Sequence, residues 1–270
     1  MLSDQELDEC AALVDELARW AIDRIVADRP RADQISTKTS DADWVTETDL
    51  DVERHVRAAI AERFPGDRIV GEEFGASDED APRAEWFVDP VDGTTNFVHG
   101  LPWSSFSLAV SDEVGAAAGV VVDPYRREVL SAVRGRGAAV DGTRCRCSDA
   151  TTITGGILLT ELVAQSLWPG MGELMAACAA EGCVTRILGS NALTLASVGA
   201  GRAVAAVLGS YGPLDGMAGT LIAREAGARV VASSGGAEPV EGEALLCAAP
   251  GVAGALLELW RTHAGRVATS

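Results

Sequence analysis

Two aspartates, Asp89 and Asp92, stand three residues apart in the stretch WFVDPVDGTTNFVHG, and Gly-Thr-Thr follows them at once. Two close carboxylates repel each other, which is costly inside a protein unless a cation or a proton compensates. The small residues that follow predict a turn of the backbone rather than a packed element. The spacing therefore predicts a site that holds something charged.

Acidic residues recur at the ends of expected strands and the starts of expected helices: Asp43, Asp49, Glu72, Glu73, Asp89, Asp92 and Asp215. Hard cations such as Mg²⁺ take oxygen ligands, usually a few carboxylates with phosphate and water. With Asp89 shared, Glu72, Asp92 and Asp215 are suited to hold two cations about 4 Å apart, the arrangement that clamps a phosphoryl displacement. Any one of these residues alone is more often a helix cap or a surface charge, and the spacing of DPVDG does not fit a calcium-binding EF-hand loop.

Gly93-Thr94-Thr95 supplies a second chemical element. If a short helix begins here, its free backbone N–H groups form an anion site, and glycine permits close approach of a phosphate. The Thr94 hydroxyl, next to the metals, is placed to orient or deprotonate a water. The alternative is that a threonine simply caps the helix.

Charge and hydropathy exclude several classes of protein. The chain has 270 residues and a formal net charge of −18, which argues against nucleic acid or an anionic membrane as partner. No apolar run approaches the ~20 residues of a membrane-spanning helix. The first residues, MLSDQELDEC, lack the pattern of a signal peptide, so a cytoplasmic location is expected.

The six cysteines are expected to be free thiols. Cys145 and Cys147 have the spacing of a metal or redox pair, but they lie in DGTRCRCSDA, which is typical of a hairpin. No second closely spaced Cys/His pair completes a zinc site.

Hydrophobic periodicity predicts helices over Ser3 to about Ala27 and about Thr48 to Phe64. The segments RIVGEE, EWFVDP, SSFSLAV, AAAGVVVD and EVLSAV then predict strands of an antiparallel meander.

After about residue 150, strands alternate with helices, which indicates a layered α/β arrangement. Strands are expected at GGILLT, AVAAVLG, ARVV and ALLCAA. Helices are expected over Gln165–Glu181, Asn191–Gly199, Pro213–Ala226 and a last segment to about His263. We expect two halves that share a core: residues 1–150, with most of the metal ligands, and residues 151–270, with Asp215 and the substrate contacts.

Four ordered motifs resemble those of the inositol monophosphatase family of Mg²⁺-dependent, Li⁺-sensitive phosphatases. WFVDPVDGTTNFVHG resembles the DPxDGTxNF signature, and IVGEEFG resembles the GEE element. SDADWVTETDLDVE resembles the upstream D-x-V-T-x-x-D segment, and PLDGMAGTLIAREAGARV resembles the C-terminal WD-x-A-x-G…EAGG motif. The resemblance implies a layered αβαβα sandwich, usually dimeric, and two or three Mg²⁺ ions per site.

The resemblance also implies roles for single residues. Glu72, Asp89 and the Val91 carbonyl would bind a first metal, and Asp89, Asp92 and Asp215 a second. Thr94 paired with Asp49 would activate the water that attacks phosphorus in line, without a phospho-enzyme. The amides of Gly93 and Thr94 would take phosphate oxygens, and Lys38 would stand near the mouth of the site, although a solvated loop lysine is an equal alternative.

Two positions depart from the family pattern. The glutamate that contacts substrate hydroxyls in inositol-type enzymes corresponds to Leu208, and the aromatic residue before the C-terminal aspartate corresponds to Leu214. An apolar residue cannot replace the hydrogen bonds of a buried hydroxyl. The candidates that compensate are Ser190, Asn191, Ser210 and Tyr211.

The expected function is Mg²⁺-dependent hydrolysis of a small polar phosphate monoester, with inositol 1-phosphate as the family-typical substrate. Histidinol phosphate, fructose 1,6-bisphosphate and a 3′-phosphonucleotide are alternatives. The alternatives of another class are a catalytically idle metal-binding scaffold and a plain acidic interaction protein.

Overall fold

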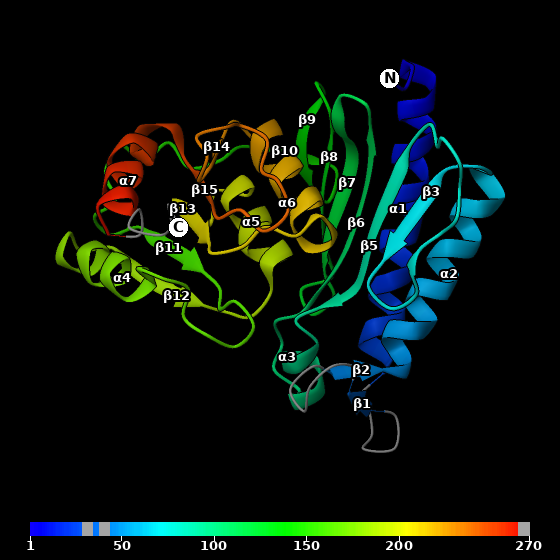
Figure 1. Cartoon of the computed structure of the whole chain (residues 1–270), viewed down its shortest axis with the longest axis horizontal. Helices are drawn as coiled ribbons and strands as arrows, with labels where there is room; N and C mark the ends of the chain where they lie inside the picture. Colours follow the sequence, from blue (N-terminus) through cyan, green and yellow to red (C-terminus); the bar gives the residue numbers. More distant parts are fainter. Residues whose placement is uncertain (29–34, 38–43, 264–270) are drawn as a thin grey trace.

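A computed structural model describes residues 1–28, 35–37 and 44–263. Five layers follow one another across the molecule in Figure 1: helices, a large sheet, more helices, a smaller sheet and outer helices. The predicted layered αβαβα sandwich is confirmed. No helix in these described ranges is long and apolar enough to cross a membrane.

The first layer consists of α1 (Asp4–Ala27) and α2 (Glu47–Arg63). Both begin with a capping box, in which side chain and backbone of the cap and third residue exchange hydrogen bonds. Ser3 and Glu6 form the box of α1, and Thr46 and Asp49 form that of α2. Two short strands, β1 (Ile35–Thr37) and β2 (Trp44–Thr46), pair antiparallel just before α2.

The large sheet has the strand order β10-β9-β8-β7-β6-β5-β3-β4. Its strands are β3 (Arg68–Gly71), β4 (Gly75–Ala76), β5 (Glu85–Asp92), β6 (Ser105–Asp112), β7 (Gly115–Asp123), β8 (Glu128–Val133), β9 (Gly137–Val140) and β10 (Thr143–Cys145). The meander from β5 to β10 is antiparallel, as predicted. The prediction was wrong for β3, which pairs parallel to β5 because a longer connection through β4 returns the chain to the same end of the sheet.

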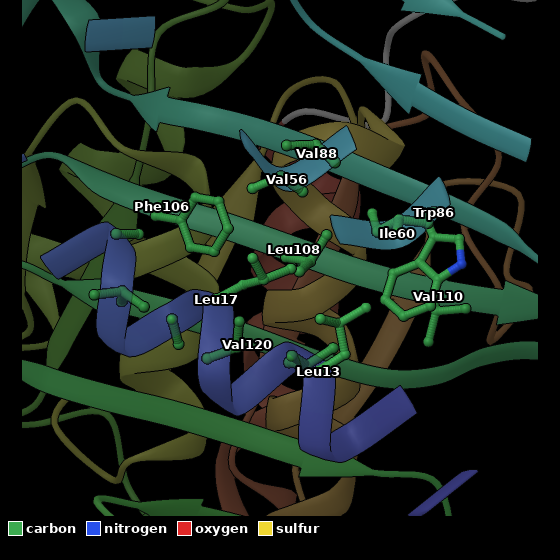
Figure 2. Close-up of a cluster of buried hydrophobic side chains, with 14 of the residues drawn as sticks. Leu13, Leu17, Val56, Ile60, Trp86, Val88, Phe106, Leu108, Val110 and Val120 are labelled. Carbon is green, nitrogen blue, oxygen red and sulfur yellow. The ribbon is translucent and has the colours of Figure 1, made fainter. Parts of the chain in front are cut away.

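The core between the first two layers explains why α1 and α2 stay on this sheet. Figure 2 shows Leu13 and Leu17 of α1 lying against Phe106, Leu108 and neighbouring side chains of the sheet, and all four are at most 1% exposed. Full burial of such a side chain contributes roughly 1.5–3 kcal/mol each. The strands in this core run apolar on both faces, because helices cover the sheet on both sides.

The middle layer consists of α5 (Asn191–Gly199) and α6 (Pro213–Glu225), which pack between the two sheets. Gly119 of β7 allows α6 to lie close to the large sheet, since an added Cβ there would lie 3.2 Å from Cα of Ala218 on α6. The smaller sheet has the order β12-β11-β13-β15-β14. Its strands are β11 (Ile157–Thr160), β12 (Val184–Ile187), β13 (Ala205–Leu208), β14 (Arg229–Ala232) and β15 (Leu245–Ala248).

The outer layer consists of α4 (Met171–Ala180) and α7 (Pro250–His263). The prediction of a helix over residues 165–181 was wrong at its start. Ala164 and Gln165 have φ of 46° and 59°, outside the helical range, and Gly170 caps the helix that does form. The edge strand β12 was missed, because its side chains are mostly exposed and show no alternation.

The expected division into residues 1–150 and 151–270 falls between β10 of the large sheet and β11 of the smaller one. The division itself stays a prediction. The two halves are closely joined, because α5 and α6 belong to the second half and pack on the sheet of the first half. All six cysteines are free, and β9 and β10 form the expected hairpin around Cys145.

Candidate active site

A β-bulge turns Asp89 and Asp92 toward the same side of β5. Residues three apart in a regular strand point to opposite faces of the sheet. Here Asp89 pairs with Ser107 and Asp92 with Ser105, so three steps along β5 match two steps along β6. One extra residue is therefore accommodated, which re-aims the second carboxylate. Both side chains are buried, with Asp89 6% and Asp92 8% exposed.

The Asp92 carboxylate is held by the loop that precedes α5. Its Oδ2 accepts hydrogen bonds from the Ser190 hydroxyl at 2.5 Å and from the backbone N–H of Ala192 at 2.8 Å. The Ser105 hydroxyl lies 3.4 Å away. Burial, with the nearby charge of Asp215, raises the pKa of Asp92 to about 8 despite these donors. The Asp92 carboxylate is thus poised to take up a proton or a cation.

Asp215 lies in the first turn of α6 and faces the same region from the second half of the chain. Its Oδ2 accepts a hydrogen bond from Nδ2 of Asn191 at 2.6 Å. Its Oδ1 is buried and has no hydrogen-bond partner. Burial raises the pKa of Asp215 to about 6. A buried carboxylate oxygen without a donor is what a site for a cation would contain.

Glu72 joins this group from the end of β3, where its backbone N–H donates to the Val88 carbonyl of β5 at 3.2 Å. Burial is the main cause that raises the pKa of Asp89, and the charges of Glu72, Asp92 and Asp215 add to it. The four predicted metal-binding carboxylates therefore share one electrostatic neighbourhood. The buried Glu53 supports this wall, since it accepts hydrogen bonds from the backbone N–H groups of Glu73 and Phe74 at 2.7 and 3.2 Å.

Asp49 lies close enough to Glu72 for that charge to act on it. Burial, with Glu72 as a smaller cause, raises the pKa of Asp49 to about 6. One oxygen of Asp49 caps α2 through Thr46, and the other, Oδ1, is buried without a partner. Asp49 thus has one carboxylate oxygen free for a further interaction.

The donor set fits Mg²⁺ by chemistry, since it consists of carboxylate oxygens that repel one another and includes two orphaned buried oxygens. The arrangement is not closed around an ion. In the part of the chain that the structure describes, no three acidic, histidine or cysteine side chains converge as a metal-holding group. The assignment of Glu72, Asp89, Val91, Asp92 and Asp215 as ligands remains a prediction.

Gly93 and Thr94 form the start of α3 (Thr94–His99). Gly93 is the N-cap, so the alternative of a threonine cap does not hold at Thr94. Gly93 has a φ of 89°, and an added Cβ would lie 2.6 Å from the Gly189 carbonyl oxygen, so only glycine fits. The Thr94 hydroxyl donates to the Val91 carbonyl at 3.0 Å rather than to Asp49. The proposed pairing of Thr94 with Asp49 is therefore not a direct hydrogen bond in this structure.

Two adjoining cavities open at these residues. The phosphate cavity, of about 370 Å³, is lined by residues that include Glu72, Asp92, Gly93, Thr94 and Asn191. The leaving-group cavity, of about 330 Å³, is lined by residues that include Asn191, Leu208, Ser210, Tyr211, Asp215 and Glu241. Glu161, Leu162, Ala164 and Asn191 line both. The site therefore has room for a phosphate and a small alcohol side by side.

The candidate substrate contacts divide into two kinds. Leu208 lines the leaving-group cavity but is only 2% exposed and belongs to a hydrophobic cluster. Ser190 is 1% exposed, and its hydroxyl is engaged with Asp92. Asn191 is half-buried and faces both cavities. Lys38 and Asp43 lie outside the described residues.

Sequence reasoning missed two residues that hold the site together. Glu161, which directly follows β11, accepts hydrogen bonds from the backbone of Leu188 and Gly189 and from the hydroxyl of Thr194. Asn96 donates to the carbonyls of Trp103 and Leu188, both at 2.7 Å, and so ties α3 to the loop before α5. An acid directly after a buried strand was the signal that identified Asp89, and it applied equally to Glu161.

Comparison with known proteins agrees with this geometry. The chain matches the Inositol monophosphatase family over residues 5–269. It is 34% identical over 238 residues to inositol monophosphatase 2 of Homo sapiens, covering 85% of this chain and 82% of that protein. It is 36% identical over 222 residues to the Nus factor SuhB of Pasteurella multocida, covering 82% of this chain and 83% of that protein.

Solved structures share the whole fold. The IMPase of Thermotoga maritima superimposes with a TM-score of 0.83 at 29% identity, covering 98% of this chain and 100% of that one. An IMPase/NADP phosphatase complexed with Mg²⁺ and phosphate has a TM-score of 0.79 at 20% identity, covering 94% of this chain and 95% of that one. The latter likeness concerns the fold alone.

Proposed function

Because the chain belongs to the inositol monophosphatase family, we propose that it is a Mg²⁺-dependent phosphomonoesterase that acts on a small phosphate ester. The observation that carries the proposal is the bulge in β5, which places Asp89 and Asp92 on one side, within the electrostatic reach of Asp215. The orphaned Oδ1 of Asp215 supports it, as does the solved structure of an IMPase/NADP phosphatase with Mg²⁺ and phosphate.

Two or three Mg²⁺ ions would be held by Glu72, Asp89 and the Val91 carbonyl, and by Asp89, Asp92 and Asp215. When bound, Mg²⁺ supplies positive charge for the phosphate and lowers the pKa of a water molecule. This role solves the problem that a chain of net charge −18 presents to an anionic substrate.

The remaining roles belong to residues of α2 and α3. The backbone N–H groups of Gly93 and Thr94 would bind phosphate oxygens at the start of α3. The Thr94 hydroxyl, with the free oxygen of Asp49, would orient the attacking water and take its proton. The Thr94 hydroxyl donates to the Val91 carbonyl, itself a proposed ligand, and so lies beside the proposed metal site.

Inositol 1-phosphate is the first substrate to test, because a relative of 34% identity is named inositol monophosphatase 2. Histidinol phosphate, fructose 1,6-bisphosphate and a 3′-phosphonucleotide are the alternatives. Inhibition by Li⁺, a cytoplasmic location and a homodimer belong to the same proposal. The absence of a nucleic-acid partner rests on the negative charge and stays a prediction, since relatives carry the name Nus factor SuhB.

Phosphate release from a panel of phosphomonoesters, with and without Mg²⁺ and with Li⁺ added, tests the proposal. We expect turnover of at least one ester that requires Mg²⁺ and falls when Li⁺ is added. A protein that binds Mg²⁺ yet releases no phosphate from any ester would instead be a metal-binding scaffold.

A further inference from the structure

In the part of the chain that the structure describes, no basic side chain lines the two cavities of the proposed active site. Among the described residues that line them, none is Lys, Arg or His. Arg261 lines a neighbouring cavity of about 570 Å³, which shares Gly209, Glu241 and Gly242 with the leaving-group cavity, but it does not line the leaving-group cavity itself. Among the residues that the structure describes, only backbone N–H groups would therefore add to the positive charge that Mg²⁺ brings to a substrate in these cavities.

The acidic residues in these cavities are not all accounted for by Mg²⁺. Glu72, Asp92 and Asp215 belong to the proposed ligand set, and Glu161 is occupied by the backbone N–H groups and hydroxyl that it accepts. Glu241 remains. It is exposed, lines the leaving-group cavity, and makes no hydrogen bond or ion pair with any residue that the structure describes. This carboxylate is free to meet a charge on the substrate.

The leaving-group cavity also offers an uncommitted hydrogen-bond acceptor directly beside Asp215. The Asn191 Nδ2 donates to Asp215. The Asn191 Oδ1 accepts no hydrogen bond from the described residues and is accessible rather than buried. Leu208, at the position where a hydroxyl-reading carboxylate was expected, is buried and apolar. An acceptor and a carboxylate together suit a donor that carries positive charge.

We propose that the leaving-group cavity selects a phosphate monoester whose alcohol carries a positive charge, the class of amino-alcohol phosphates. The proposal rests on the proposed function. At the position where inositol-type readers offer a carboxylate, a neutral polyol meets the apolar Leu208, with the neutral side chains of Asn191 and Ser210 nearby. An alcohol that carries a second anionic group meets Glu241, and no described Lys, Arg or His lines the leaving-group cavity, so bisphosphates and phosphonucleotides are disfavoured.

Three probes of nearly equal size separate charge from shape: O-phosphoethanolamine (cationic), 2-hydroxyethyl phosphate (neutral) and 2-phosphoglycolate (anionic). We expect kcat/KM with Mg²⁺ to fall in that order. The preference should shrink as salt is raised from 20 to 300 mM, because the charges involved are near solvent. An anionic probe that is hydrolysed as fast as the cationic one would overturn the proposal.

The variant Glu241→Gln isolates the carboxylate, and Glu173→Gln on the outer helix α4 is its matched control, since both remove one exposed charge. We expect Glu241→Gln to reduce the ratio of cationic to anionic kcat/KM roughly two- to fivefold, the range of an exposed ion pair. The neutral probe should be unaffected in both variants. An unchanged ratio, or an equal change in Glu173→Gln, would refute the assignment of Glu241.

The same assay keeps this inference apart from the proposed function. Mg²⁺-dependent release of phosphate from the neutral probe, with kcat/KM values that do not fall from the cationic to the anionic probe, would refute this inference and leave the proposed function standing. No Mg²⁺-dependent release from any probe would overturn the phosphatase proposal and the inference with it.

Discussion

The carboxylate of Glu161 accepts a hydrogen bond from the backbone N–H of Gly189, with 2.6 Å between Oε2 and the nitrogen. The two residues after Gly189 hold two of the proposed metal ligands, since Ser190 donates to Asp92 and Asn191 to Asp215. Glu161 is 4% exposed and stands outside the ligand set. A buried carboxylate of the second half of the chain thus fixes carboxylates of both halves through one loop.

Replacing Glu161 should therefore impair the site through the loop. Glu161→Gln keeps the shape but loses an acceptor, so we expect Mg²⁺ affinity and kcat to fall about 10- to 100-fold, as for other partners of metal ligands. Mg²⁺ binding by titration calorimetry and kcat measure the two effects. Asp112→Asn is the control, because Asp112 is another buried carboxylate that accepts backbone N–H groups, at the opposite end of β6 from Ser105. A variant Glu161→Gln with normal Mg²⁺ binding would show that the loop holds its position without this residue.

Asp92→Asn should abolish turnover while the fold remains nearly intact. The substitution removes the negative charge and leaves a neutral amide in contact with Ser190 and Ala192. Activity and the thermal unfolding midpoint are measured together. Wild-type rates in this variant would mean that Asp92 is not a metal ligand.

The metal-free protein should become less stable as pH rises from about 4 to about 8. The folded-state pKa of Asp92 is about 8 and that of Asp215 about 6, both above the value of about 3.9 in an unfolded chain. The native state then binds more protons than the unfolded state, so stability falls with pH in this window. Thermal unfolding in EDTA at a series of pH values measures the slope, and a stability that rises across the window would contradict it.

Mg²⁺ should raise the unfolding midpoint more at pH 8 than at pH 5. The ion competes with protons for the same carboxylates, and a ligand stabilises only the state that binds it. In Asp92→Asn the difference between the two pH values should shrink. Equal Mg²⁺ shifts at both pH values in the wild type would argue against these carboxylates as the binding site.

Gly93→Ala should cost both stability and activity. A left-handed backbone costs a non-glycine residue roughly 1–2 kcal/mol, and the added Cβ would also meet the Gly189 carbonyl. Gly100→Ala at the other end of α3 is the matched control, because its φ is 70° but an added Cβ meets nothing within 4 Å. We expect Gly100→Ala to lower the free energy of unfolding by a similar amount, because its backbone is also left-handed, and to keep its activity. Equal loss of activity in both variants would place the effect in α3 as a whole.

Local features of the sequence predicted much of the fold. The capping box of Ser3 and Glu6, the periodicity of α1 and α2, and the alternation of strands and helices after residue 150 depend on neighbours in the chain, and the structure has these elements close to the expected bounds. The predicted start of α4 was wrong, because Ala164 and Gln165 adopt left-handed backbone conformations that their residue types do not indicate.

The sequence by itself determined which residues could do the chemistry, because carboxylates at strand ends and a Gly-Thr-Thr turn are written in short, contiguous stretches. Only the tertiary structure decided how they meet. The bulge that aligns Asp89 with Asp92 exists through pairing with β6. The bonds from Ser190 to Asp92 and from Asn96 to Leu188 join residues 98 and 92 positions apart. Such contacts depend on packing two sheets against a shared layer of helices, and no local pattern encodes that packing.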